Sequence, residues 1–392
     1  MKKIIISIIL IAAACSLSAQ NQYDTILQQI EANSLTLNAL RLEIDAKKLN
    51  NRTGIYLPNP EIEFNYLWGN PAETGNRRDI KIMQSFDFPT VYTNKNKISK
   101  LENANVDIEY KSERINLLLS AKQICIQLTY YNALINEYKY RLQNAENIAN
   151  TYKTKLDKGE TTAIEHNKAQ LYLISVENEI KNIETERNSL LSELKQLNGG
   201  NEISFSADSF YSKNLTFDFE QWYAQAETKN PMLQYISGQI AINRHQVKLN
   251  KLLMLPKFTA GYMREQVVGQ RFEGLTVGIS IPLWENKNKV KQAKTQVKAS
   301  EATFDDKRIQ FYNYLQNLYT KAVDLQQTAA KYKKALSQYN NDKLLKKALD
   351  AGEISLLDYL LECQYYYQIL NKMLETERDF ELTLAKLEMY ES

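Results

Sequence analysis

Histidine and cysteine, the side chains best suited to metal binding or nucleophilic catalysis, are sparse in this chain. His166 and His245 are its only histidines, and each lies in a long helical pattern without a cysteine or second histidine at ligand spacing. Cys125 and Cys363 also lie in helical patterns, where a packing role is favoured over a disulfide or a metal site. No glycine-rich loop that could hold phosphate is present. The residues therefore favour a protein that is not an enzyme and has no metal and no cofactor.

Composition and charge give no sign of a nucleic-acid partner. Charged residues make up 24% of the 392 residues, the mean hydropathy is −0.47 and the formal net charge is +3. So small a net charge provides almost no field that would attract a charged macromolecule. After the first residues, no apolar stretch reaches the roughly 18 residues that a membrane helix needs. If the chain enters a membrane, it must do so through β-strands.

The first 19 residues have the layout of a secretory signal peptide. Lys2 and Lys3 precede an apolar run over residues 4–14. The small residues of a cleavage site follow, and the last of them is Ala19. We therefore expect cleavage before residue 20, which lowers the formal net charge from +3 to +1 because both lysines are lost. Cys15 leaves open the alternative that the chain is lipidated.

The distribution of proline and glycine predicts very long helices. Residues 90–230 contain none of the seven prolines, and residues 283–392 also contain none. Both stretches are rich in Leu, Lys, Glu, Gln and Ala, which favour helices. We expect one helix from Val91 to Leu156 and another from Trp284 to Leu349. At roughly 1.5 Å per residue, about 65 residues give each helix a length of roughly 100 Å.

Each long helix ends in the same short motif, and the two motifs lie 193 residues apart. Residues 156–165 read Leu-Asp-Lys-Gly-Glu-Thr-Thr-Ala-Ile-Glu, and residues 349–358 read Leu-Asp-Ala-Gly-Glu-Ile-Ser-Leu-Leu-Asp. Glycine just past a helix end supplies a left-handed cap, and Thr161 or Ser355 can cap the following helix. The motifs predict helical hairpins within two structural repeats, residues 20–200 and 201–392.

Each repeat also contains a short region with the alternation of β-strands. We expect a strand hairpin at about residues 60–89 and another at about 257–282, with strands of about 8 to 11 residues, long enough to cross a bilayer when tilted. The side chains expected to face the membrane are Ile62, Phe64, Tyr66, Trp68, Ile80, Ile82, Phe86, Phe88, Phe258, Tyr262, Leu275, Val277, Ile279 and Ile281. A water-soluble sheet with one buried face is the alternative, and the secretion signal favours the membrane.

Four strands cannot close a barrel in lipid, where every backbone donor and acceptor needs a partner. The smallest membrane barrels have about eight strands, so several protomers must share one barrel. Two copies would give eight strands and three copies would give twelve. The strand count alone does not choose between them.

Over essentially the whole mature length, the chain resembles the TolC-like outer membrane efflux protein family. The resemblance rests on the duplicated halves, on one strand hairpin in each half, on Ile281-Pro282 before a polar helix start, on the Asn230-Pro231 helix start, and on the hairpin glycines Gly159 and Gly352. It implies a mainly α fold with a small antiparallel β part. Three protomers would share a twelve-stranded transmembrane barrel that continues into a periplasmic tunnel of coiled-coil-like helices.

The resemblance also implies a location, partners and site residues. The protein would be the outer-membrane channel of a tripartite efflux or secretion system in a Gram-negative type envelope, in contact with outer membrane lipid, a periplasmic membrane-fusion adaptor and a proton-driven or ATP-driven inner-membrane pump. The adaptor would dock at the hairpin tips, which are Leu156, Gly159, Glu160, Thr161, Leu349, Gly352, Glu353 and Ser355. Asp358 and its counterpart Glu165 would form a lumenal gate, where a carboxylate repeated by symmetry binds cations. Leu361 stands where some members have a second acid.

A different class of protein remains as the alternative. A periplasmic coiled-coil scaffold or adaptor would have the long helices but no transmembrane barrel. Strand alternation with aromatic residues near the strand ends in both halves favours the channel. The sequence leaves open whether the exported substrate is a drug, a metal ion or a protein.

Overall fold

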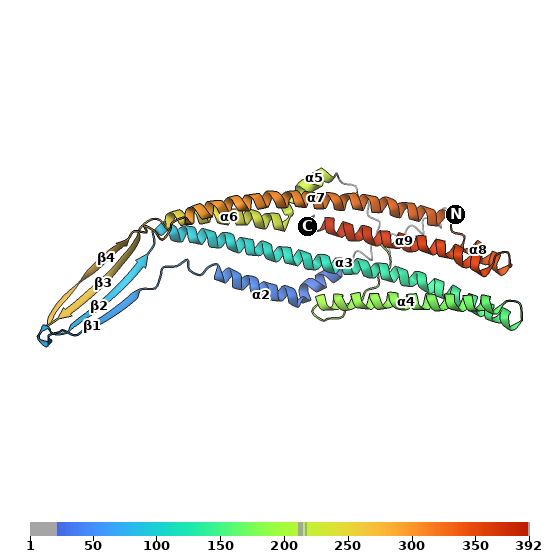
Figure 1. Ribbon diagram of the computed structural model, residues 1–392, viewed down its shortest axis with the longest axis horizontal. Helices are drawn as coiled ribbons and strands as arrows, with labels where there is room; N and C mark the ends of the chain where they lie inside the picture. Colours follow the sequence, from blue (N-terminus) through green and yellow to red (C-terminus); the bar gives the residue numbers. More distant parts are fainter. Residues whose placement is uncertain (1–21, 211–214, 216–217, 391–392) are drawn as a thin grey trace. The chain divides into compact units, whose positions relative to one another are not determined.

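The computed structural model describes residues 22–210, 215 and 218–390 (Figure 1). The expected signal peptide and Cys15 lie outside the described residues. Residues 22–33 are helical. The further elements are α2 (Leu35–Asn50), β1 (Glu61–Leu67), the short 3-10 helix η1 (Ala72–Thr74), β2 (Arg77–Phe86), α3 (Pro89–Asp157), α4 (Ala163–Leu197), α5 (Phe219–Lys229), α6 (Pro231–Leu252), β3 (Lys257–Val267), β4 (Gln270–Ser280), α7 (Lys289–Gln338), α8 (Asp342–Asp350) and α9 (Leu356–Glu388). This confirms the expected fold class of long helices with one small antiparallel sheet.

The helix of the first half matches its expectation closely, and the helix of the second half does not. Helix α3 runs without interruption for 69 residues, with its start at Pro89, where a missing N–H is harmless. The expected helix from Trp284 to Leu349 is wrong at both its start and its interior. Helix α7 begins only at Lys289, because Asn288 adopts φ +67° and cannot belong to a right-handed helix.

A break then separates α7 from α8 at Tyr339, Asn340 and Asn341. Asparagine is a poor helix former because its side chain competes for nearby backbone groups. Asn341, the residue before α8, has φ −103° and ψ 6°, outside the helical region. The second half therefore reaches its hairpin through a separate nine-residue helix.

The four strands form one antiparallel sheet in the order β1-β2-β3-β4. Strands β1 and β2 form one hairpin and β3 and β4 form the other, within the two ranges expected from the alternation. The two hairpins join through β2 and β3, where Arg77 pairs with Val267 and Phe86 pairs with Phe258. Strands β1 and β4 are therefore the two edges of the sheet.

The chain divides into two compact units, and each combines segments of both expected repeats. In the described residues, the first unit contains 22–39, 113–210, 215, 218–229 and 311–390, and the second contains 40–112 and 230–310. The repeat boundaries themselves stay a prediction. None of the helices in the described ranges is both long enough and apolar enough to cross a membrane.

Within the part of the chain that the structure describes, the first unit has three separate apolar clusters along its helices. Ile30, Leu128 and Leu194 are fully buried and belong to one cluster with Phe205. Cys125 lies in the same cluster, and burial raises the pKa of its thiol to about 12. This agrees with a packing role for Cys125, because a protonated, buried thiol is inert.

The second unit packs its helices through a smaller apolar cluster and several buried asparagines. Val91, Ile98, Ile242 and Leu249 form the apolar cluster. Beside it, the Asn94 side-chain amide donates to the carbonyl of His245 at 3.0 Å, and Asn94 Oδ1 lies 3.1 Å from His245 Nδ1. Burial, together with nearby lysines, lowers the pKa of His245. His245 thus holds α6 against α3 by hydrogen bonds.

Candidate functional site: the apolar sheet face and the hairpin ends

The strand register gathers apolar side chains on one face of the sheet. Ile62 pairs with Ile82, Ile82 with Tyr262, and Tyr262 with Leu275, so these four side chains form one row across the sheet. Residues two positions apart on a strand share a face, so the neighbouring rows add the remaining apolar positions. Those neighbours are Phe64, Ile80, Phe86, Phe258, Val277 and Ile279.

Most of this apolar face is exposed. Leu275 is 88% exposed, Val277 81% and Ile62 74%. Large apolar side chains gain about 1.5–3 kcal/mol each when they leave water, so a contiguous exposed patch marks a surface that contacts something apolar. The face is therefore a surface for lipid or for another apolar partner.

The opposite face of the sheet is polar and contains ion pairs. Arg77 Nε lies 2.9 Å from the Asp79 carboxylate and 3.1 Å from the Glu265 carboxylate. Lys81 Nζ lies 3.5 Å from the carboxylate of Glu63 on the neighbouring strand. The sheet thus has one charged, hydrated face and one apolar face.

Three of the residues expected on membrane-facing strands lie just beyond the strand ends. Trp68 follows β1, Phe88 follows β2 and Ile281 follows β4. Gly69 and the prolines Pro89 and Pro282, which follow these residues, interrupt regular pairing. All three side chains are exposed. They extend the apolar face at its two ends rather than lying within it.

Both helical hairpins turn through the same backbone geometry. At the end of α3, the N–H of Gly159 donates to the Leu156 carbonyl at 2.9 Å and the N–H of Glu160 donates to the Lys155 carbonyl at 2.8 Å. After α8, the N–H of Gly352 donates to the Leu349 carbonyl at 3.1 Å, and the N–H of Glu353 donates to the Ala348 carbonyl at 2.9 Å. Gly159 has φ +74° and Gly352 has φ +73°. Each glycine therefore occupies the left-handed position of a Schellman cap.

The helices that leave these turns are capped by side chains. Thr162, and not Thr161, caps α4: its hydroxyl accepts from the N–H of Glu165 at 3.3 Å. Thr162 is one residue closer to the first turn of α4, which is why its oxygen reaches the third N–H. Ser355 caps α9 as expected, with its hydroxyl accepting from the N–H of Asp358 at 3.2 Å.

The two candidate gate residues occupy equivalent positions at these caps. Asp358 completes a capping box: its carboxylate accepts from the hydroxyl of Ser355 at 2.6 Å and from the Ser355 N–H at 3.2 Å. These hydrogen bonds hold the pKa of Asp358 below its usual value. Glu165, the third residue of α4, instead pairs with Lys168 at 2.9 Å. Asp358 is thus an exposed and ionised carboxylate with a structural role at the helix start.

One apolar cluster joins the two hairpin ends. It contains Ile148 and Tyr152 from α3, Ala169 from α4, Leu349 from α8, and Leu356, Tyr359, Cys363 and Tyr367 from α9. Figure 1 shows the turn between α3 and α4 beside the turn between α8 and α9. Leu349 is only 7% exposed, so it supports the tip from inside. Gly159, Glu160, Gly352, Glu353 and Ser355 are exposed, and Leu156 and Thr161 are partly exposed.

Sequence reasoning missed the tyrosines that build this cluster. Tyr359 is 1% exposed, and its hydroxyl accepts a hydrogen bond from the side-chain amide of Asn144 at 2.8 Å. Arg141 is also buried, with its guanidinium 4.3 Å from the ring centre of Tyr138 and 4.2 Å from that of Tyr367. The 25 tyrosines of the chain gave no pattern that separates these from surface residues.

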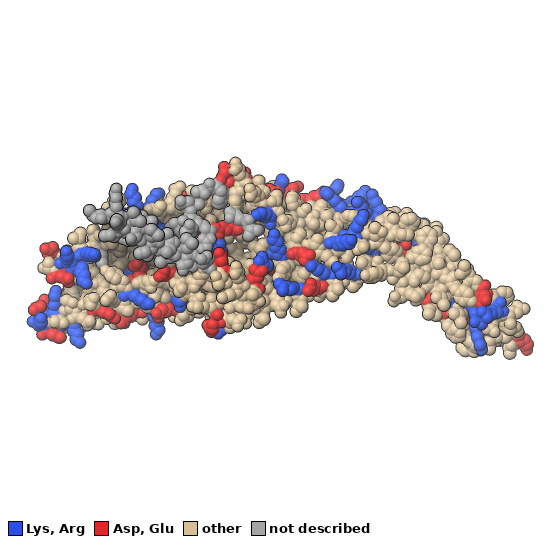
Figure 2. All heavy atoms as spheres, turned by 180° about the vertical axis from the view of Figure 1, so that it is seen from behind, with Lys and Arg blue, Asp and Glu red and all other residues tan. Residues whose placement is uncertain are grey.

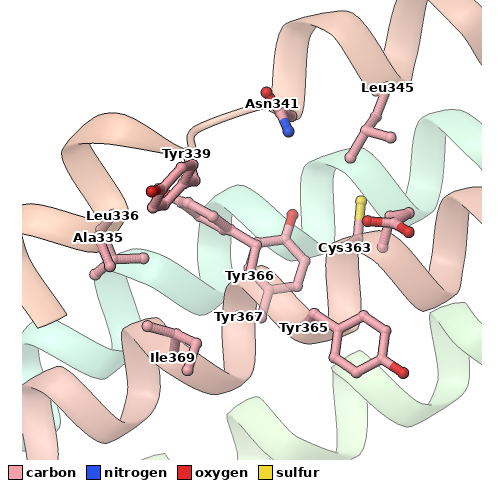
Figure 3. Close-up of a pocket in the computed structure, with 11 residues that line it drawn as sticks. Ala335, Leu336, Tyr339, Asn341, Leu345, Cys363, Tyr365, Tyr366, Tyr367 and Ile369 are labelled. Atoms are coloured by element: carbon pink, nitrogen blue, oxygen red, sulfur yellow. The ribbon is translucent and has the colours of Figure 1, made fainter.

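The break between α7 and α8 adds a cavity of about 260 Å³ beside the second hairpin. Figure 3 shows the rings of Tyr339 and Tyr366 in this cavity, with Leu345 and Cys363 on another side. The amide of Asn340 donates to the hydroxyl of Tyr366 at 3.3 Å. Aromatic side chains therefore line the space that opens where the helix is interrupted.

Comparisons with known proteins bear on the fold. No protein-family model matches the sequence, and no curated protein does either. Among solved structures, the outer membrane protein VceC from Vibrio cholerae has a TM-score of 0.78 and 14% identity, covering 94% of this chain and 96% of that one. The CmeC outer membrane channel from Campylobacter jejuni has a TM-score of 0.72 and 14% identity, covering 94% and 85%.

A structure of CusC, described in terms of folding and transmembrane channel formation, has a TM-score of 0.80 and 14% identity, covering 94% of this chain and 92% of that one. At such low identity the likeness concerns the fold. The similarity to TolC-like proteins expected from the sequence is confirmed at that level. This chain has the fold of outer membrane channels, with long helices and a four-stranded sheet.

Proposed function

We propose that this chain is one protomer of an outer-membrane channel in a tripartite efflux or secretion system, through which substrates pass without catalysis. The exposed apolar face of the sheet carries this proposal, with Leu275 and Val277 more than 80% exposed on it. Such a face is unfavourable in water and favourable in lipid. A periplasmic scaffold would leave the face in water, so the observation favours the channel.

The two sheet edges support a barrel shared between protomers. In the described residues, β1 and β4 each have a neighbouring strand on one side only. Unpaired backbone groups are strongly unfavourable in lipid, so β4 of one protomer pairs with β1 of the next. The fold shared with the channels favours three protomers and twelve strands. The helices then extend into the periplasm, and the polar sheet face with Arg77, Asp79 and Lys81 lines the barrel interior.

The hairpin ends are the proposed docking site for a periplasmic adaptor, which links the channel to an inner-membrane pump. The exposed backbone turns at Gly159 and Gly352, with the adjacent Glu160 and Glu353, form two similar surfaces on one protomer. Three protomers repeat the pair into a ring of six. Leu349 stays part of the proposed docking site as the residue that supports the second turn from inside, because it is buried in one cluster with Leu356 and Tyr359.

Asp358 and Glu165 are the proposed gate residues near these ends. Asp358 is exposed on α9, and its hydrogen bonds with Ser355 favour the ionised form. Threefold repetition of an ionised carboxylate makes a ring that attracts cations and repels anions. The capping role of Asp358 and a gating role are compatible, because one carboxylate oxygen makes the hydrogen bonds and the other remains available.

Photo-crosslinking in intact cells tests the docking assignment. A crosslinking amino acid at Glu160 or at Glu353 is expected to capture an adaptor, which mass spectrometry then identifies together with its pump. The matched control replaces Lys181, an exposed residue of α4, the helix that follows Glu160; it lies roughly 30 Å from the helix start at about 1.5 Å per residue. Capture of sister protomers alone from both tip positions, or equal adaptor capture from position 181, would contradict the assignment.

A further inference from the structure

Arginines gather at one end of the apolar sheet face. On this face, the row nearest the hairpin turns contains Tyr66, Arg78, Gln266 and Arg271. The next row aligns Phe64, Ile80, Arg264 and Glu273. Since paired positions share a face, Arg78, Arg264 and Arg271 lie on the same side of the sheet as the apolar residues.

The charge of this cluster is unbalanced. Three arginines face a single carboxylate, that of Glu273, which leaves two positive charges on each protomer. Arg271 already binds Glu273, with its Nε 2.9 Å from the carboxylate, and the hydroxyl of Tyr262 donates to the same group at 2.8 Å. Among the described residues, Arg78 and Arg264 have no carboxylate within ion-pair distance.

Arg78 is held in place without a counter-charge. Its guanidinium lies 5.5 Å from the ring centre of Tyr66, and the hydroxyl of Tyr66 accepts from the side-chain amide of Asn76 at 2.7 Å. A guanidinium placed over an aromatic ring keeps the N–H groups at its own edge available for other acceptors. Arg78 therefore presents an oriented donor group rather than a freely moving charge.

The opposite end of the same face has no such residues. The row nearest the helices contains Phe86, Phe258 and Ile279. Ile279 and Arg271 lie eight positions apart on β4, which is about 26 Å along the strand at about 3.3 Å per residue. In Figure 2 the middle of the sheet is mostly uncharged, and blue side chains lie together with red ones at the end with the hairpin turns. The apolar band is thus bordered by arginine on one side only.

We propose that Arg78 and Arg264 bind the phosphate groups of lipid headgroups in the membrane leaflet at the hairpin turns. The inference rests on the proposed function, which puts this face in contact with lipid and the helices on the periplasmic side. Guanidinium groups form paired hydrogen bonds with phosphate oxygens, and such bonds strengthen at an interface with little water. The face would therefore recognise a phosphorylated glycolipid of the outer leaflet, and the phosphates would anchor the barrel at its outer rim.

Native mass spectrometry of the full chain in nanodiscs tests the proposal. The probes are lipid A with two phosphates and the same lipid without phosphates. The double variant R78Q/R264Q is expected to retain bisphosphorylated lipid A about fivefold less well than the unaltered protein, because two exposed charge pairs between arginine and phosphate are lost. The control K81Q removes one charge from the same strand on the opposite face and is expected to leave lipid retention unchanged.

Phosphate-free lipid A is expected to bind weakly and equally to all three proteins, and excess inorganic phosphate is expected not to displace the bound lipid. Equal retention of the bisphosphorylated lipid by R78Q/R264Q would overturn the proposal while leaving the channel intact. Displacement by inorganic phosphate would overturn the assignment to lipid. Failure of the unaltered protein to enter nanodiscs at all would overturn the proposed function as well.

Discussion

Val277→Lys is expected to reduce the amount of assembled protein in the outer membrane by at least about tenfold, because each lysine near the bilayer centre costs about 2–4 kcal/mol. Val277 is 81% exposed on the apolar face and lies two rows from the arginine cluster. Every protomer of a trimer would contain the charge, so the penalty is repeated three times. The measurement is the quantity of heat-labile oligomer in outer membrane fractions.

Thr276→Lys is the matched control, since Thr276 is the neighbouring residue of the same strand and faces the polar side beside Gly261. A lysine there would extend into the proposed water-filled interior and is expected to leave assembly within about twofold of normal. If both variants assembled equally well, the apolar face would not contact lipid.

Tyr359→Ala is expected to destabilise both hairpin ends, at a cost of about 3–5 kcal/mol for removing a large, fully buried side chain. Tyr359 is 1% exposed and contacts residues from both hairpins in one cluster. Hydrogen exchange is expected to become faster around Gly159 as well as around Gly352, although Tyr359 belongs only to the second half.

Tyr359→Phe separates packing from hydrogen bonding at this position. It keeps the ring and removes the hydroxyl that accepts from Asn144, so the expected loss is about 1 kcal/mol. Faster exchange confined to the second hairpin in Tyr359→Ala would contradict the coupling of the two ends through this cluster.

Local signals in the sequence were enough to predict the hairpins and the strands. Gly159 and Gly352 end helices because only glycine adopts a positive φ without strain, and that requirement is visible in the sequence. The alternation of Ile62, Phe64 and Tyr66 likewise fixes a strand face before any pairing is known. Long stretches without proline or glycine defined α3 almost to its ends.

Features that depend on tertiary contacts could not be predicted in this way. Leu349 follows the same pattern as Leu156, yet only its packing against Leu356 and Tyr359 buries it. The sequence at Asn340 and Asn341 shows only a small local preference against a helix, and the tyrosines that line the adjacent cavity come from α9 as well as from the break itself. The arginine cluster brings together residues almost 200 positions apart, so it becomes visible only once β2 is paired with β3.

Disulfide crosslinking between protomers tests the shared barrel most directly. Cysteines replace Glu63 in β1 and Thr276 in β4, and same-face neighbours on each strand are scanned in further pairs to find the register. Within one protomer these two strands are the opposite edges of the sheet, about 14 Å apart at about 4.8 Å per strand, which is too far for a disulfide. A closed barrel of three protomers predicts covalent dimers and trimers, and nothing larger, for at least one pair and for neither single cysteine. Monomers alone across the whole scan, or an open ladder of larger species, would contradict a closed barrel of three protomers.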